Sequence, residues 1–168
     1  MKAAQVVSYE SPPEFSEVDD PQAGEGMDLV EVEVAGLNPI DLAIASGKFD
    51  AGAPPLPYVA GREGIGTTPD GRRIWFDGPA FPFGSMAEVA PVPSGTGIEV
   101  PEGIDSADAL AFGIAGMAAW LSLGWRGGLQ PGETVLVLGA SGSVGQIAVQ
   151  AAKLMGAGRV VGAARSAS

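Results

Sequence analysis

The chain contains 168 residues, enough for one ordinary domain or for one domain and the start of a second. Cysteine and histidine are both absent, which excludes disulfides, thiolate or imidazole metal sites, cysteine nucleophiles and every catalytic triad that needs histidine. A net charge of −11 disfavours nucleic acids and anionic membrane surfaces as partners.

The charge is unevenly distributed along the chain. Residues 1–110 hold 19 acidic and 5 basic side chains, whereas residues 111–168 hold one acidic and four basic side chains. We therefore expect the C-terminal part to accept an anion. The first seven residues lack the unbroken apolar core of a secretory signal, so we expect a cytoplasmic protein.

Short strands separated by glycine and proline clusters are predicted up to about residue 100. In the clearest of them, Val30 and Val32 share one face while Glu31 and Glu33 take the other, the pattern of a half-buried strand. The six predicted strands are residues 1–7, 28–35, 62–68, 72–77, 85–90 and 97–100.

A short helix is predicted from Asn38 to about residue 46. Asn38 suits the N-cap, Pro39 the first helical position, and Asp41 the first turn, where its charge faces the positive end of the helix.

The pattern changes to helix from Asp105, and residues 109–125 carry no charge. These 17 residues reach the short limit for a membrane span. Glycines interrupt the segment, however, and Asp105 and Asp108 suit the capped start of a helix in water. The segment therefore predicts a buried helix and no membrane partner.

A strand, a helix and a second strand are predicted next. Residues 134–138 form a continuous apolar run typical of a parallel strand covered on both faces. Apolar residues then recur at helical spacing until Gly156, which favours a helix end. Residues 159–164 complete a βαβ unit.

The turn between the first strand and the helix is rich in glycine, and in this context it predicts a dinucleotide-binding site. Glycines let backbone N–H groups approach a pyrophosphate, and the start of the helix presents free amides to it. Ala140 takes the usual place of the first glycine, so the turn must accept one methyl group. A tight turn without a ligand is the alternative. The predicted cofactor-binding residues are Gly139, Ala140, Ser141, Gly142, Ser143, Val144 and Gly145.

The end of the second strand bears on the choice of cofactor. In dinucleotide folds an acid about 20 residues beyond the glycines binds the ribose 2′-hydroxyl. This chain has Ala164 at that place, followed by Arg165 and Ser166. A guanidinium and no carboxylate favour the 2′-phosphate of NADPH. The alternative is that Arg165 is only a solvated surface residue.

Taken together, the motifs resemble the medium-chain dehydrogenase/reductase superfamily, in its branch of zinc-independent quinone oxidoreductases and enone reductases. The resemblance implies a mixed α/β fold: a GroES-like β-barrel domain over residues 1–125, then an incomplete, truncated start of a doubly wound Rossmann NADP-binding domain over residues 126–168. It also implies a homodimer for the full-length protein. The motifs lie at residues 36–42, 46–49, 61–66, 115–120 and 139–145.

Zinc enzymes of this superfamily carry a cysteine where this chain has Asn38 and a histidine where it has Arg62. The resemblance therefore implies no metal, and NADPH-dependent hydride transfer to a quinone or an α,β-unsaturated carbonyl. It places Asn38 near the reacting carbonyl as a hydrogen-bond donor, although its place as helix cap is an equal alternative. It leaves Glu63 a structural hydrogen-bonding role. Without the threonine that relatives often carry at position 118, the cofactor geometry is less well defined.

Three aromatic residues, Phe49, Tyr58 and Trp75, are candidates for lining the substrate cleft, with a place in the hydrophobic core as the alternative. Two other functions remain open. The protein could bind NADPH without catalysis, as a sensor or a structural protein, or the glycine turn could open a short-chain reductase domain. A Rossmann domain needs more strands than this chain supplies, so we expect the 168 residues alone to be inactive.

Overall fold

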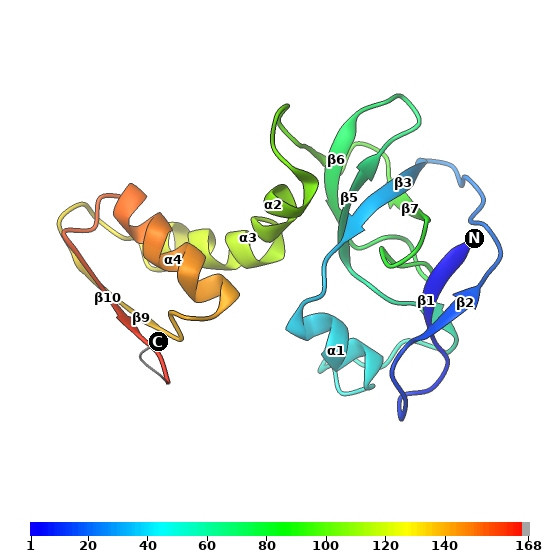
Figure 1. Ribbon diagram of the computed structural model, residues 1–168, viewed down its shortest axis with the longest axis horizontal. Coiled ribbons are helices and arrows are strands. Elements are labelled where there is room, and N and C mark those ends of the chain that lie inside the picture. Colours follow the sequence, from blue (N-terminus) through cyan, green and yellow to red (C-terminus); the bar gives the residue numbers. More distant parts are fainter. Residues whose placement is uncertain (166–168) are drawn as a thin grey trace. The chain divides into compact units, whose positions relative to one another are not determined.

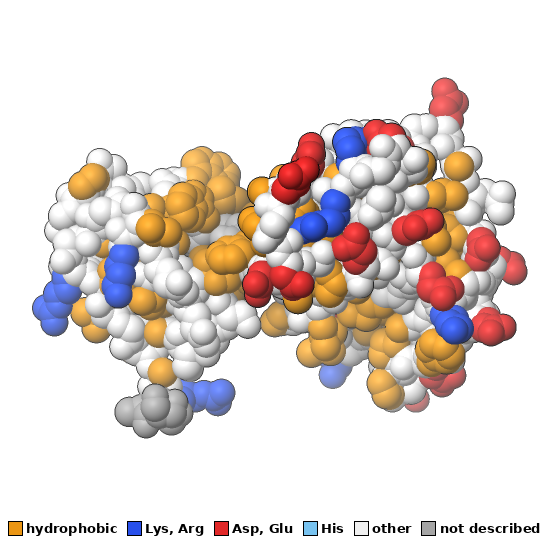
Figure 2. All heavy atoms as spheres, turned by 45° about the horizontal axis from the view of Figure 1, so that its top comes forward, with side chains coloured by type: hydrophobic (Ala, Val, Ile, Leu, Met, Phe, Trp, Pro, Cys, Tyr) orange, Lys and Arg blue, Asp and Glu red, His pale blue; other side chains and the backbone are white. Residues whose placement is uncertain are grey.

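The computed structural model describes residues 1–165, which fall into two compact units that divide between Leu110 and Ala111. The fold is mixed α/β, as predicted (Figure 1). Helix α3 (Ile114–Leu121) belongs to the second unit, because it packs on helix α4 (Ser143–Leu154). The domain boundary at residue 125 remains a prediction. The acidic side chains visible in Figure 2 gather on the first unit.

A five-stranded antiparallel sheet is the largest element of the first unit. Its second strand, β3 (Met27–Ala35), shows the predicted alternation: Val30 is fully buried, whereas Glu31 and Glu33 are exposed. The strand order is β7 (Val89–Pro93), β3 (Met27–Ala35), β5 (Glu63–Thr67), β6 (Arg73–Asp77) and β8 (Ile98–Glu99).

A three-stranded antiparallel sheet lies beside helix α1 (Pro39–Ala45). Its strands are β2 (Glu14–Glu17), β1 (Lys2–Val6) and β4 (Tyr58–Val59), in that order. The Ala4 N–H donates to the Met86 carbonyl at 2.8 Å, which ties β1 to the segment before β7. Two apolar clusters fill the unit, one around Phe76 on the large sheet and one around Val6 and Tyr58.

Strand β7 corrects the predicted strand over residues 85–90. The structure places the strand at Val89–Pro93, so it begins four residues later than predicted and includes Pro91 and Pro93. Proline lacks a backbone N–H and is tolerated where that side of the chain faces no neighbouring strand. Because β7 is the edge of its sheet, Pro91 and Pro93 fit there without loss of a ladder bond.

The second unit contains the predicted βαβ pattern. Strands β9 (Thr134–Leu138) and β10 (Arg159–Ala163) are parallel, and Ala163 pairs with Leu138 at their carboxyl ends. Helix α4 connects them and ends just before Gly156, as predicted. Its inner face is formed by small residues, among them Ala148 and Ala151, which are buried.

The prediction of one buried helix over residues 109–125 was wrong. Helix α2 (Ser106–Ala111) stops before Gly113, α3 follows, and a π-helical turn, η1 (Ser122–Arg126), ends the segment. Trp120 and Trp125 are 50% and 71% exposed. Glycine at 113 starts a new helix, and the described residues cover only one face of α3. Within residues 1–165, no helix combines the length and the apolarity that a membrane crossing requires.

Candidate functional site

The glycine turn joins β9 to α4 and is held by backbone hydrogen bonds to the end of β10. Gly139 has a φ of +74°, which favours glycine, and its N–H donates to the Ala163 carbonyl at 2.8 Å. The Ala140 N–H donates to the same carbonyl at 3.0 Å. These two amides hold the turn against β10, so they are not the ones that a phosphate would meet.

The amides without a partner inside the helix belong to the start of α4. The first bond of the helix runs from the Gln146 N–H to the Gly142 carbonyl, so the amides of Ser143, Val144 and Gly145 precede it. Gly142 provides no capping side chain, and the first turn holds no acidic residue. The positive end of the helix is therefore free to receive an anion.

Close contact between the turn and α4 depends on Gly145. A Cβ atom there would lie 2.1 Å from the Gly139 carbonyl oxygen and 2.7 Å from the Ala140 Cα. The methyl group of Ala140 is accommodated by a neighbouring residue that sequence analysis did not identify. A Cβ on Gly162 of β10 would lie only 2.9 Å from the Ala140 Cβ, so glycine at 162 makes room for that methyl group.

Ala164 and Arg165 follow β10 directly and are exposed. Because β9 and β10 are parallel and pair at Leu138 and Ala163, Arg165 leaves the sheet at the same edge as the glycine turn. Arg165 forms no ion pair within residues 1–165. The predicted site residue Ser166 lies outside the described residues.

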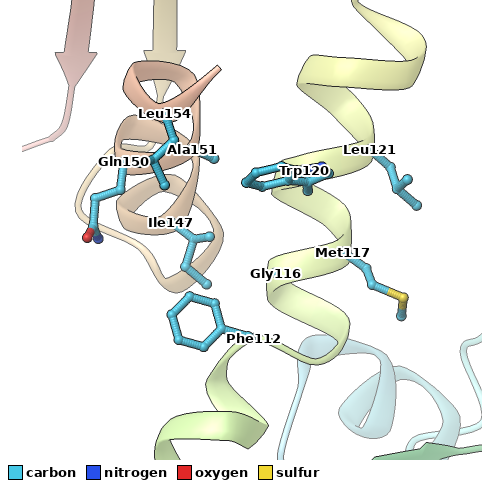
Figure 3. Close-up of a pocket in the computed structure, with 9 residues that line it drawn as sticks. All are labelled: Phe112, Gly116, Met117, Trp120, Leu121, Ile147, Gln150, Ala151 and Leu154. Carbon is cyan, nitrogen blue, oxygen red and sulfur yellow. The ribbon is translucent and has the colours of Figure 1, made fainter. Parts of the chain in front are cut away.

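A pocket of about 420 Å³ lies between α3 and α4, away from the glycine turn. Trp120 points from α3 toward α4, and Ile147 and Ala151 approach it from α4 (Figure 3). The lining is apolar except for Gln150 and contains none of the predicted cofactor residues.

In the first unit, Asn38 stands at the N-cap of α1, as predicted. Its N–H donates to the Asp41 carboxylate at 2.7 Å, and the Arg62 N–H donates to the other oxygen of Asp41 at 3.0 Å. Burial raises the pKa of Asp41 above its usual value, and these two hydrogen bonds oppose the rise. The Asn38 side chain reaches further, since its Nδ2 donates to Glu63 at 2.7 Å.

Glu63 is a buried acid that sequence analysis treated only as structural. Its side chain is 3% exposed, and its second oxygen accepts from the Trp75 indole at 2.9 Å. Arg62, at the family's histidine position, instead donates through Nε and Nη2 to Asp77 at 3.0 Å each. This bond raises the pKa of Arg62.

The three aromatic candidates do not line one cavity. Tyr58 is buried and lines a cavity of about 160 Å³ together with Asp41 and Arg62. Its hydroxyl has no hydrogen-bond partner among the described residues, and burial raises its pKa. Trp75 binds Glu63, and Phe49 lies half-buried in the turn after α1. Neither Phe49 nor Trp75 lines that cavity.

No family model matches the chain. It is 35% identical over 140 residues to prostaglandin reductase-3 of Bos taurus, covering 79% of this chain and 36% of that protein. It is 32% identical over 163 residues to 2-methylene-furan-3-one reductase of Solanum lycopersicum, covering 86% of this chain and 42% of that protein.

Among solved structures, the chain resembles the quinone oxidoreductase of Thermus thermophilus, which was also solved in complex with NADPH. The TM-score is 0.88 at 35% identity, over 99% of this chain and 54% of the other. The chain thus spans only about a third to a half of the relatives that it matches. These relatives are of the reductase types that the motifs resemble, and the chain belongs to the medium-chain dehydrogenase/reductase superfamily.

Proposed function

We propose that the protein containing this chain is an NADPH-dependent oxidoreductase that reduces quinones or α,β-unsaturated carbonyls without zinc. The observation that carries the proposal is the uncapped, acid-free start of α4 behind a glycine turn, at the sheet edge where Arg165 emerges. The similarity to a quinone oxidoreductase, to prostaglandin reductase-3 and to 2-methylene-furan-3-one reductase supports the same chemistry.

The residues of the second unit fit the cofactor. The amides of Ser143, Val144 and Gly145 would hold the pyrophosphate, and Arg165 with Ala164 and Ser166 would receive the 2′-phosphate. When bound, NADPH supplies a hydride for the electron-poor carbon of the substrate, and water supplies the proton that the resulting enolate takes up.

The first unit would supply the polar contact to the substrate. Asn38 keeps a second N–H on Nδ2 beyond the one that Glu63 accepts, and this N–H would donate to the carbonyl oxygen as negative charge develops there. The scheme makes no use of zinc, since Asn38 and Arg62 offer neither the thiolate nor the imidazole that would bind it at these positions. Tyr58, Trp75 and Phe49 remain candidates for substrate contact.

Steady-state oxidation of NADPH by the full-length protein tests the proposal, with 1,4-benzoquinone and a simple enone as acceptors. We expect turnover that survives dialysis against a chelator. Binding of NADPH without turnover would instead favour the noncatalytic sensor, and absence of both would overturn the proposal. The homodimer and the cytoplasmic location remain predictions, which light scattering and cell fractionation of the full-length protein would check.

A further inference from the structure

Glu63 connects two side chains that sequence analysis assigned to different roles. Its Oε1 accepts from Nδ2 of Asn38, the proposed carbonyl donor, and its Oε2 accepts from Nε1 of Trp75, a candidate substrate contact. The two bonds are 2.7 and 2.9 Å long. A single carboxylate therefore orients one residue at the start of α1 and one on β6.

The absence of a side chain on Gly36 leaves room for the Glu63 carboxylate. A Cβ atom on Gly36 would lie 2.7 Å from both Cγ and Oε1 of Glu63. The Gly36 N–H also donates to the Glu63 carbonyl at 3.0 Å, which fixes the backbone of β5 beside it. Glu63 is 3% exposed, so water does not compete for its two bonds.

The chemistry of the three groups makes the arrangement directional. An ionised carboxylate only accepts hydrogen bonds, and an indole N–H only donates. An amide presents a donor at one end and an acceptor at the other, so its rotation is set by its partner. Glu63 therefore holds the nitrogen end of Asn38 toward itself and leaves the second N–H of that nitrogen as the donor.

We propose that Glu63 is a positioning residue for reduction, which acts by fixing the rotation of the Asn38 amide. This inference rests on the proposed function and adds to it a residue that does not itself meet the substrate. Replacing Glu63 with glutamine tests it. The side chain of glutamine has one acceptor oxygen, and the Trp75 indole, which can only donate, would take it. The NH₂ group of the glutamine would then face Asn38 and favour the rotation of the Asn38 amide that presents its oxygen.

The experiment compares wild type, E63Q, N38A and the double variant E63Q/N38A in the full-length protein, with NADPH and 1,4-benzoquinone. We expect E63Q to lower kcat by about tenfold to a hundredfold, with the dissociation constant for NADPH unchanged. If Glu63 acts through Asn38, E63Q should cause no further loss in the N38A background. The exposed substitution E31Q, which also removes one negative charge, is the matched control and should leave kcat within about twofold.

If the fold-losses in kcat of E63Q and N38A multiply in the double variant E63Q/N38A, the inference is overturned and the proposed function is left intact. If the wild-type protein fails to oxidise NADPH with any quinone or enone, both the inference and the proposed function are overturned. Should E63Q fail to fold, E63D serves in the same four-way comparison. It keeps the charge but shortens the side chain by one methylene, so it cannot reach both donors, and it should lose its effect in the N38A background.

Discussion

At the scale of single residues, Ala140 and Gly162 form one steric unit at the carboxyl edge of β9 and β10. The turn carries a methyl group where the family usually has glycine, and the neighbouring strand has no side chain at the point that this methyl group occupies. The effect on stability of a substitution at one position should therefore depend on which residue stands at the other.

We predict that G162A destabilises the full-length protein by about 1 to 3 kcal/mol, because two methyl groups would then compete for one space. Adding A140G should recover most of the loss, since it removes the competing group. Denaturant unfolding of the two single variants and the double variant checks this. If the losses of unfolding free energy in G162A and A140G simply add in the double variant, the contact between positions 140 and 162 is not the cause of the loss in G162A.

Arg165 should give the protein a preference for NADPH over NADH. A guanidinium bound to the 2′-phosphate would favour NADPH by about ten- to a hundredfold, less at high salt because the residue is exposed. The double substitution A164D/R165A adds a ribose-binding carboxylate, removes the phosphate partner, and should reverse the order. Values of kcat/KM for both cofactors in both proteins provide the test. Equal use of the two cofactors by wild type would make Arg165 an ordinary surface residue.

Asp41 should make stability depend on pH in the direction opposite to most paired acids. Its folded pKa is raised, so the folded state holds the proton more tightly than the unfolded chain does. Its contribution to stability is present below the unfolded pKa, near 3.8, and is lost as pH rises through the folded value. The unfolding free energy of wild type minus that of D41N should therefore fall as pH rises from about 4. A difference that rises with pH would contradict the assignment.

Sequence reasoning found part of this site and missed the rest for a physical reason. The glycine turn and the Asn38 cap are local patterns, so they are visible within a few neighbouring residues. Glu63 meets partners 25 and 12 residues away, which only the pairing of β5 with β6 and the path to α1 bring together. The contact of Ala140 with Gly162 likewise depends on strand register.

At the scale of elements, the same distinction decides which strands were predicted. Strand β3 and the β9–α4–β10 unit show their own periodicity, and both were found close to their true bounds. Strands β2 and β4 were not predicted, because they are four and two residues long and are defined by pairing with β1. Short edge strands carry little pattern of their own.

The approach of α4 to the glycine turn gives a prediction for a whole element. G145A should push α4 away from the turn, because the added Cβ would lie 2.1 Å from the Gly139 carbonyl oxygen. We expect NADPH to bind at least tenfold more weakly and the melting temperature to fall by several degrees. G24A is the matched control, since Gly24 lies outside the proposed cofactor site and its Cβ would make only an ordinary 3.6 Å contact with the Met27 Cγ. Similar losses in both variants would argue against a specific role for the close approach.

At the scale of the whole molecule, the second unit leaves much apolar surface uncovered. Leu136 and Leu138 of β9 are 61% and 77% exposed, and Leu154 of α4 is 79% exposed. We predict that residues 1–168 expressed alone self-associate and do not turn over NADPH with a quinone, whereas the full-length protein does. Gel filtration and the turnover assay on both proteins check this. A monomeric 168-residue protein with ordinary turnover would contradict it.

The prolines of β7 determine where such association would begin. Pro91 and Pro93 remove donors from the outer side of the first unit's large sheet, and the Pro91 carbonyl already accepts from the Ala80 N–H at 2.8 Å. At the opposite edge, β8 has only two residues. The large sheet of the first unit therefore has no long unpaired edge to which another strand could add. Strands β9 and β10 contain no proline that would block such an addition. Templated strand addition would spread through the second unit and leave the barrel-like sheets of the first unit intact.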